Sequence, residues 1–214
     1  MRAEAKGALI DDRAAAASDR EIQFLRSAYQ AISERGVHRV SLQEIAEMVG
    51  VSKGLIPYYF KTKDRLVLRT MEWILSIVAG RIRESITGAR TAEERVLAMI
   101  DVIFAGPEQN RRFYLTYLDL LDHVARVEGF AELSATFRSI INSLYAEVIR
   151  SGQETGAFRV TETEEAATIV RAIIDGLFFQ WLQEKNWEEL HPRYRAACKR
   201  AVLTYLKAAP VSET

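Results

Sequence analysis

The sequence predicts an all-α protein with an N-terminal head of three helices and a helical C-terminal domain. Apolar residues recur at spacings of three and four along most of the chain, and no segment alternates as a strand does. Only 4 of the 214 residues are proline, so helices can run long between their breaks. With 49% hydrophobic residues, the chain can bury a full core as one large or two small domains.

Composition narrows the class of protein. The charges of the 29 basic and 29 acidic residues cancel, so the net charge of the molecule does not indicate a polyanionic partner. A single cysteine, Cys198, excludes an internal disulfide framework and is expected to pack as a small hydrophobe. No apolar run reaches the roughly 18 residues that span a bilayer, and residues 1–17 carry charges where a secretory signal would be apolar. We expect a cytoplasmic protein without a membrane partner, whose residues 1–17 form a flexible arm.

The first helix of the head is predicted from Ser18 to about Arg35. Ser18 with Glu21 three residues later is a capping signal, because each side chain satisfies backbone donors that a helix start leaves free. The expected inner face consists of Leu25, Ala28, Tyr29 and Ile32.

A second capping signal, Ser41 with Glu44, starts the next helix near Leu42. Its apolar residues again share one face, and Gly50 is expected to end it in the left-handed conformation. The residues of that face are Leu42, Ile45, Ala46 and Val49.

The third helix is expected from Lys53 to Phe60, with Ser52 as its N-cap and with Ile56 and Phe60 as buried anchors. Pro57 is tolerable there, because a first-turn amide has no intrahelical partner. Two short helices around a tight turn form a helix-turn-helix, whose second helix presents its N-terminal residues to base edges in the major groove. The sequence therefore predicts a DNA-binding protein.

The outer side chains of this helix suit DNA contact in different ways. Lys53 can donate to a guanine edge or a phosphate, and Gly54 permits close approach of the backbone. The hydroxyls of Tyr58 and Tyr59 can reach phosphates, whereas Leu55 offers only apolar contact, for instance to a thymine methyl group.

The order of residues from Arg35-Gly36 through I-A-E-M-V-G-V-S-K-G-L-I-P-Y-Y-F-K-T-K-D-R-L resembles the tetracycline-repressor (TetR) family of bacterial transcriptional regulators. The resemblance covers about the first third of the chain. Leu55 and Pro57 depart from it, since the family usually has Thr or Ser before Ile56 and an aromatic residue after it. The resemblance also implies that Lys63 touches the phosphate backbone. The expected DNA-contacting residues are Ser41, Lys53, Gly54, Leu55, Tyr58, Tyr59 and Lys63.

Local charge agrees with that expectation. Between Arg35 and Arg65 there are six basic and three acidic residues, and a dimer would double the excess. A solvated helix face accounts for such a charge run equally well on its own. Placement inside the motif favours contact with phosphates.

Six further helices follow, with breaks at glycine and proline. The head is expected to occupy residues 18–62 and the second domain residues 63–210. The predicted helices of the second domain are Lys63–Thr87, one from Thr91 to the Gly106-Pro107 stop, Phe113–Arg126, Ala131–Gln153, Glu164–Gln183 and Pro192–Ala208.

The stretch Ala166–Trp181 is apolar on more than one face, so it needs partners on two sides. We expect one side to meet the domain core and the other to pair with a second copy of the chain, together with Ala131–Gln153, in a four-helix interface. A central helix in a monomeric bundle is the alternative. The predicted interface residues are Ala172, Ile173, Gly176, Leu177 and Gln180.

The family resemblance implies a small-molecule site, and the second domain is rich in aromatic side chains that line such sites. Each of them is also explained by core packing. The predicted lining residues are Trp73, Phe104, Tyr114, Tyr117, Phe137, Phe178 and Trp181. The expected function is a dimeric repressor that a small, largely apolar ligand releases from a palindromic double-stranded DNA operator. A DNA-binding regulator that needs no ligand, with a fully packed second domain, is the alternative.

An enzyme or metal protein is the least favoured class. His38, His123 and His191 are far apart, and none lies in a spaced metal motif. Asp119, Asp122 and His123 fall within about one helical turn, but an acidic helix face explains them equally well. No nucleophile elbow or phosphate-binding glycine loop is present, so neither catalysis nor a cofactor is expected.

Overall fold

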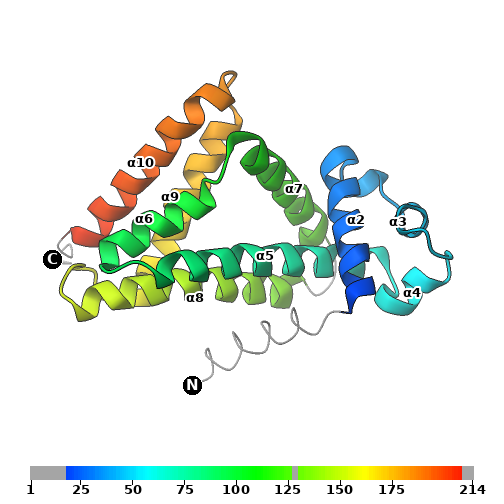
Figure 1. The fold of residues 1–214 in the computed structure, drawn as a ribbon, viewed down its shortest axis with the longest axis horizontal. Coiled ribbons are helices and arrows are strands. Elements are labelled where there is room, and N and C mark those ends of the chain that lie inside the picture. Colours follow the sequence, from blue (N-terminus) through cyan, green and yellow to red (C-terminus); the bar gives the residue numbers. More distant parts are fainter. Residues whose placement is uncertain (1–17, 127–129, 209–214) are drawn as a thin grey trace. The chain divides into compact units, whose positions relative to one another are not determined.

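A computed structural model describes the backbone of residues 18–126 and 130–208, without the side chains of Val124 and residues 130–138. Within those ranges the chain is built from helices and no strand occurs, which confirms the predicted fold class (Figure 1). The arm expected at residues 1–17 lies outside the described residues. None of the described helices is long and apolar enough to cross a membrane.

The chain forms two compact units. The first combines residues up to Ile77 with Arg112–Phe137, and the second combines Val78–Arg111 with the residues from Arg138 onward. The head therefore shares a unit with the greater part of α7 (Pro107–Ala125). The predicted domain boundary between residues 62 and 63 stays a prediction.

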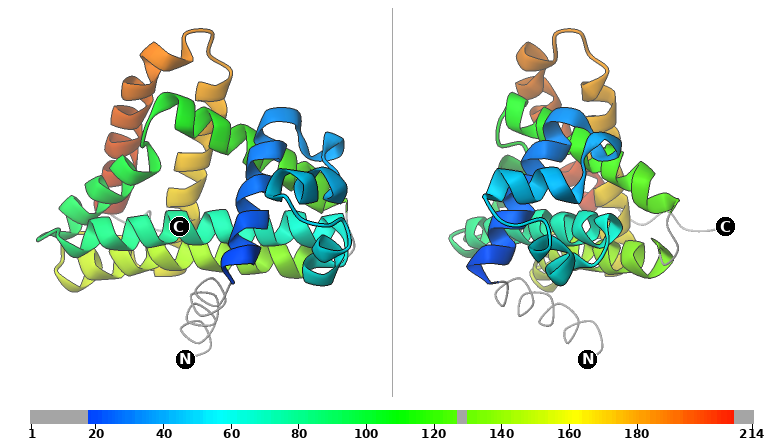
Figure 2. Two further views of the ribbon diagram at one scale, coloured as in Figure 1. Left: turned by 45° about the vertical axis from the view of Figure 1, so that its right-hand side comes forward. Right: turned by 90° about the vertical axis from the view of Figure 1, so that its right-hand side faces the viewer.

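In the first unit, α2 (Asp19–Arg35) leads through the short 3-10 turn η1 (Val37–Arg39) into α3 (Leu42–Val49) and α4 (Leu55–Phe60). Figure 2 shows α3 packed beside α2, with α4 following it. The capping box of Ser41 with Glu44 is present in full. Gly50 ends α3 at φ 72° and ψ 36°, the left-handed conformation that the sequence predicted.

The start of α4 differs from the prediction. The helix begins at Leu55 instead of Lys53, and its N-cap is Gly54, without a side-chain capping bond. The prediction of Ser52 as N-cap was wrong, because Ser52 accepts the amide of Leu55 through its backbone carbonyl instead. Pro57 is the third residue of α4, where its missing amide costs no intrahelical bond.

The head has a mainly apolar core, to which α5 (Lys63–Thr87) and α7 contribute. Phe24 packs edge-on against Phe60, with ring centroids 5.9 Å apart. The buried residues of this core include Phe24, Leu25, Ala28, Ile32, Ile45, Ala46, Ile56, Phe60, Leu66, Met71 and Leu120.

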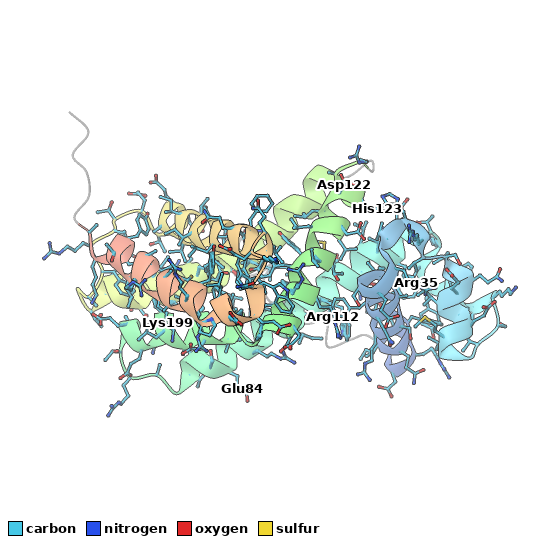
Figure 3. The ribbon with its side chains drawn as sticks, turned by 90° about the horizontal axis from the view of Figure 1, so that it is seen from above. Arg35, Glu84, Arg112, Asp122, His123 and Lys199 are labelled. Carbon is cyan, nitrogen blue, oxygen red and sulfur yellow. The ribbon has the colours of Figure 1, made fainter. Side chains whose placement is uncertain are left out.

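The second unit contains α6 (Ala92–Ile103), most of α8 (Phe130–Glu154), α9 (Thr163–Leu182) and α10 (Trp187–Lys207). Helix α10 lies along both α9 and α6 (Figure 1). Ion pairs join α10 to α6, with Lys199 Nζ 2.6 Å from Asp101 Oδ1 (Figure 3 labels Lys199).

Two helices start five or six residues earlier than predicted. Helix α7 begins at Pro107 instead of Phe113, because a proline that stops one helix also suits the first position of the next. Helix α10 begins at Trp187 instead of Pro192 and keeps that proline inside it.

A buried polar pair lies in the core of the second unit. The Nε2 atom of His191 is 2.8 Å from Oδ1 of Asn110, whose amide nitrogen donates to the carbonyl of Ile103. Burial, with a smaller effect of the Arg195 charge, lowers the pKa of His191. The imidazole is therefore neutral at pH 7, and it serves as a satisfied core residue.

Candidate functional site

The short helix α4 is anchored by two side chains and presents the rest outward. Ile56 is fully buried and Phe60 is 3% exposed, as the sequence predicted. Tyr58 is 80% exposed, and Gly54 and Pro57 are exposed as well. The buried side chains of Ile56 and Phe60 thus fix the helix on the core of the head, while its outer face is accessible to a partner.

Tyr59 is held in place by its neighbours. Its ring centroid lies 5.3 Å from that of Phe24 and 5.6 Å from that of Tyr58. About a third of the residue remains exposed. An aromatic side chain fixed in this way can offer its hydroxyl group at little entropic cost.

The outer face of α4 carries few hydrogen-bonding groups. Leu55 and Pro57 are apolar, and Lys53 lies just before the helix, only loosely paired with Glu47 at 3.9 Å. Leu55 is half-buried. Such a surface suits apolar contact with thymine methyl groups, flanked by phosphate contacts from Lys53 and Tyr58.

Ser41 and Lys63 also have partners inside the protein. Ser41 Oγ accepts the amide of Glu44 and donates to its carboxylate, and the bonds from Ser41 are the main reason that the pKa of Glu44 is lowered. Lys63 Nζ donates to the carbonyl of His38 at 3.4 Å. Their contacts with DNA, like those of the α4 residues, stay predictions.

Gly54 is not required by the fold. Its φ of −74° and ψ of −17° suit any residue, and an added Cβ would meet no atom of the described chain within 4 Å. Neither the backbone conformation nor the packing requires glycine at this position. A glycine at the start of a recognition helix therefore fits the predicted close approach to DNA.

A groove of about 330 Å³ lies beside α4, between α2 and α5. Lys61 and Arg65 line it together with Tyr59, and Arg69 spans Glu21 and Glu72 in it at 2.8 and 2.6 Å. The sequence had drawn attention to Lys61 and Arg65 only through their charge. The groove itself joins residues from three helices, which no local pattern discloses.

Of the predicted ligand-site residues, Tyr114 and Tyr117 lie with Phe113 in one aromatic cluster on α7. The rings of Phe113 and Tyr117 are nearly parallel, with centroids 6.1 Å apart. Next to them is a cavity of only about 10 Å³, lined by Tyr29, Met71, Leu75 and Leu120 among others. It is large enough for about one water molecule and far below the 300–1,000 Å³ of typical small-molecule sites.

The other predicted ligand-site residues are distributed differently. Phe104, Phe178 and Trp181 are fully buried in the second unit, where Phe104 stacks on Phe178 at 4.1 Å. Trp73 on α5 is half-buried, and the side chain of Phe137 lies outside the described residues. Their role in a ligand site remains a prediction.

Helix α9 has the two faces that the sequence indicated. Phe178 and Trp181 point into the core, whereas the adjacent Phe179 is 58% exposed. Ala172 and Gln180 are exposed, and Ile173, Gly176 and Leu177 are half-buried. Phe179 was missed by the sequence analysis, although two successive aromatic residues on a helix must lie on different faces.

The cluster Asp119, Asp122 and His123 does not gather around one point. Asp119 accepts the amide of Val37, and Asp122 pairs with Arg126 at 2.7 Å. His123 Nε2 lies 2.8 Å from Asp64 Oδ1. Among the described residues, no group of three or more His, Cys, Asp and Glu side chains is placed to hold a metal ion.

Comparison with known proteins agrees with this architecture. Residues 24–70 match the family described as "Bacterial regulatory proteins, tetR family", and residues 92–207 match "BetI-type transcriptional repressor, C-terminal". The HTH-type transcriptional regulator BetI of Brucella anthropi is 28% identical over 164 residues, which cover 75% of this chain and 80% of the relative. The BetI regulator of Rhizobium meliloti is 27% identical over 157 residues, covering 72% and 73%.

Solved structures share the fold. A protein from Saccharomonospora viridis, crystallised in complex with choline, has a TM-score of 0.74 at 24% identity, covering 87% of this chain and 96% of its own. A TetR-family structure from Rhodococcus sp. has a TM-score of 0.73 at 23% identity, covering 89% and 100%. These matches confirm the resemblance found in the sequence. Since the BetI-type match alone spans more than half of the chain, the chain belongs to the TetR family of bacterial DNA-binding transcriptional regulators, with a C-terminal part of BetI type.

Proposed function

We propose that the protein is a cytoplasmic homodimeric repressor that binds a palindromic operator and leaves it when a small ligand binds. The observation that carries the DNA-binding part is the exposed outer face of α4 on two buried anchors, Ile56 and Phe60. A single α4 spans only a few base pairs. Two copies, one helical turn of DNA apart, are the usual way in which such heads gain specificity.

The exposed face of α9 supports the homodimer. Phe179 leaves a large apolar side chain in solvent, and Gly176 beside it has open space where a side chain would stand. A second helix can approach closely at a glycine, so pairing α9 with its copy would bury Phe179.

We further propose a quaternary ammonium ligand of the choline type. The BetI-type match and the choline complex of the Saccharomonospora protein support this class. Phe113, Tyr114 and Tyr117 supply ring faces on one helix, and such faces attract a cation within about 6 Å of their centroids. Tyr117 is the member of the predicted site that lines the cavity beside these rings, and we expect it nearest to the ligand.

The small cavity beside these rings bears on how the ligand acts. At about 10 Å³ it has no room for a quaternary ammonium group, so binding there requires the lining helices α2, α5 and α7 to move apart. A ligand moves such an equilibrium only by its differential affinity for the two arrangements. The same closed packing favours the second candidate, a regulator that binds DNA without a ligand.

Choline titrated into a complex of the protein with an operator, selected from random duplexes, tests the proposal. We expect saturating choline to lower operator affinity by about tenfold or more, a typical coupling between two sites. The uncharged isostere 3,3-dimethylbutan-1-ol is expected to have little effect, because the rings attract the charge.

Tyr117→Ala should abolish the choline effect and keep operator binding, whereas Tyr205→Ala on α10 should behave as the wild type. Tight operator binding that neither choline nor its isostere changes would contradict the choline proposal and favour the ligand-independent regulator.

A further inference from the structure

One turn of α7 contacts the helix-turn-helix at both of its ends. Asp119 reaches the backbone just before the motif, and His123, four residues later on the same face, reaches the residue after Lys63 just behind it. Figure 3 shows Asp122 and His123 at the end of α7, beside the ribbon of the head. All these residues belong to the first compact unit.

The contact before the motif, between Asp119 and the amide of Val37, depends on an unusual backbone conformation at Gly36. Gly36 has φ 81° and ψ 155°, a conformation that residues with a side chain rarely adopt. This bend lets the amide of Val37 donate to Asp119 Oδ2. Val37 is fully buried, so its amide has no easy alternative partner in water. A Cβ on Gly36 would stand 3.5 Å from the same carboxylate oxygen.

The contact behind the motif, between His123 and Asp64, lies next to Lys63, which is an expected DNA contact. His123, whose side chain is only 14% exposed, pairs with Asp64 in the first turn of α5. Asp64 directly follows Lys63, whose Nζ donates to the carbonyl of His38 in η1. The ring of His38 in turn lies 5.6 Å from that of His123. The segments before and behind the motif, η1 and the start of α5, thus contact one another, and both contact α7.

We propose that Asp119 and His123 are positioning residues that fix the helix-turn-helix on α7 and so set the orientation in which α4 meets DNA. Neither residue needs to touch DNA. On the same helix, Tyr117 lies two residues and Phe113 six residues before Asp119, so a shift of α7 at these aromatic residues would be passed to both ends of the motif. This proposal rests on the proposed operator binding and is independent of the choice of ligand.

The test compares four variants, Asp119→Leu, Asp119→Asn, His123→Leu and Asp122→Ala, at a temperature at which each is fully folded, without any ligand. Asp119→Leu removes the acceptor at similar size, and Asp119→Asn keeps one acceptor oxygen. Asp122→Ala is the matched control, since Asp122 is exposed, one turn away, and pairs with Arg126. Operator affinity and hydrogen exchange at the Val37 amide are measured for each.

We expect Asp119→Leu to weaken operator binding by about tenfold or more and to speed exchange at Val37 by a similar factor, because a buried amide loses its partner. Asp119→Asn should keep most of the operator affinity and most of the protection of the Val37 amide from exchange. Asp122→Ala should change neither the affinity nor the exchange rate. His123→Leu should weaken operator binding without faster exchange at Val37. Wild-type affinity or unchanged Val37 exchange in Asp119→Leu would overturn the proposal. If the wild-type protein itself selected no operator, the proposed function would fail, and the exchange data would still decide whether Asp119 holds the motif.

Discussion

Gly176→Leu is expected to turn the dimer into monomers and to lower operator affinity by about 100-fold or more, because two linked heads gain that much from acting together. In the isolated chain a side chain at residue 176 meets open space, so the fold should tolerate it. In the proposed dimer the same side chain would separate the two copies of α9. Sedimentation equilibrium gives the mass, and a thermal unfolding curve shows whether the fold is intact.

Gly80→Leu is the matched control for this experiment. Gly80 is also a helical glycine with open space around it, but it lies on α5. This variant should stay dimeric and keep its operator affinity. A Gly176→Leu protein that sediments as a stable dimer would show that α9 does not form the interface at this residue.

Gly54→Leu is expected to reduce operator affinity by about 100-fold, with a smaller loss for Gly54→Ala. Replacing a glycine in a helical conformation by alanine stabilises the folded state by about 0.4–1 kcal/mol, so a loss of binding would not come from unfolding. The physical reason is distance, since each added carbon atom holds the backbone of α4 further from the groove floor. Fluorescence anisotropy with a labelled operator measures the affinities.

Thermal unfolding of the two Gly54 variants is the necessary companion measurement. Their midpoints should equal or exceed that of the wild type, because no atom of the described residues lies near the new side chain. Wild-type operator affinity in Gly54→Leu would mean that this end of α4 does not approach DNA closely.

Local signals made much of the head predictable. The capping box of Ser41 with Glu44 and the left-handed Gly50 depend on residues within one turn of each other, and both are present as predicted. Helical spacing likewise identified Ile56 and Phe60 as the buried anchors. Helix boundaries were predicted less accurately where one residue type is compatible with two local structures. Ser52 resembles an N-cap, and Pro107 both stops α6 and starts α7.

Long-range contacts were beyond the reach of sequence patterns. Asp119 and Val37 are 82 residues apart, and nothing in the spacing of either helix indicates that they meet. From the spacing alone, Asp119 is a member of an acidic helix face or of a cluster with Asp122 and His123, and neither interpretation places it at Val37. Aromatic residues posed a similar problem, because Phe178 and Tyr117 look alike in a periodic pattern. One lies fully buried in the core of the second unit, and the other lines a small cavity in the first.

A hydroxyl-radical footprint of the wild-type protein on its selected operator tests the central claim most directly. The account predicts two protected patches related by two-fold symmetry, with centres about 10 base pairs apart, as expected when two α4 helices enter successive major grooves. A single protected patch, or uniform protection without sequence preference, would contradict it.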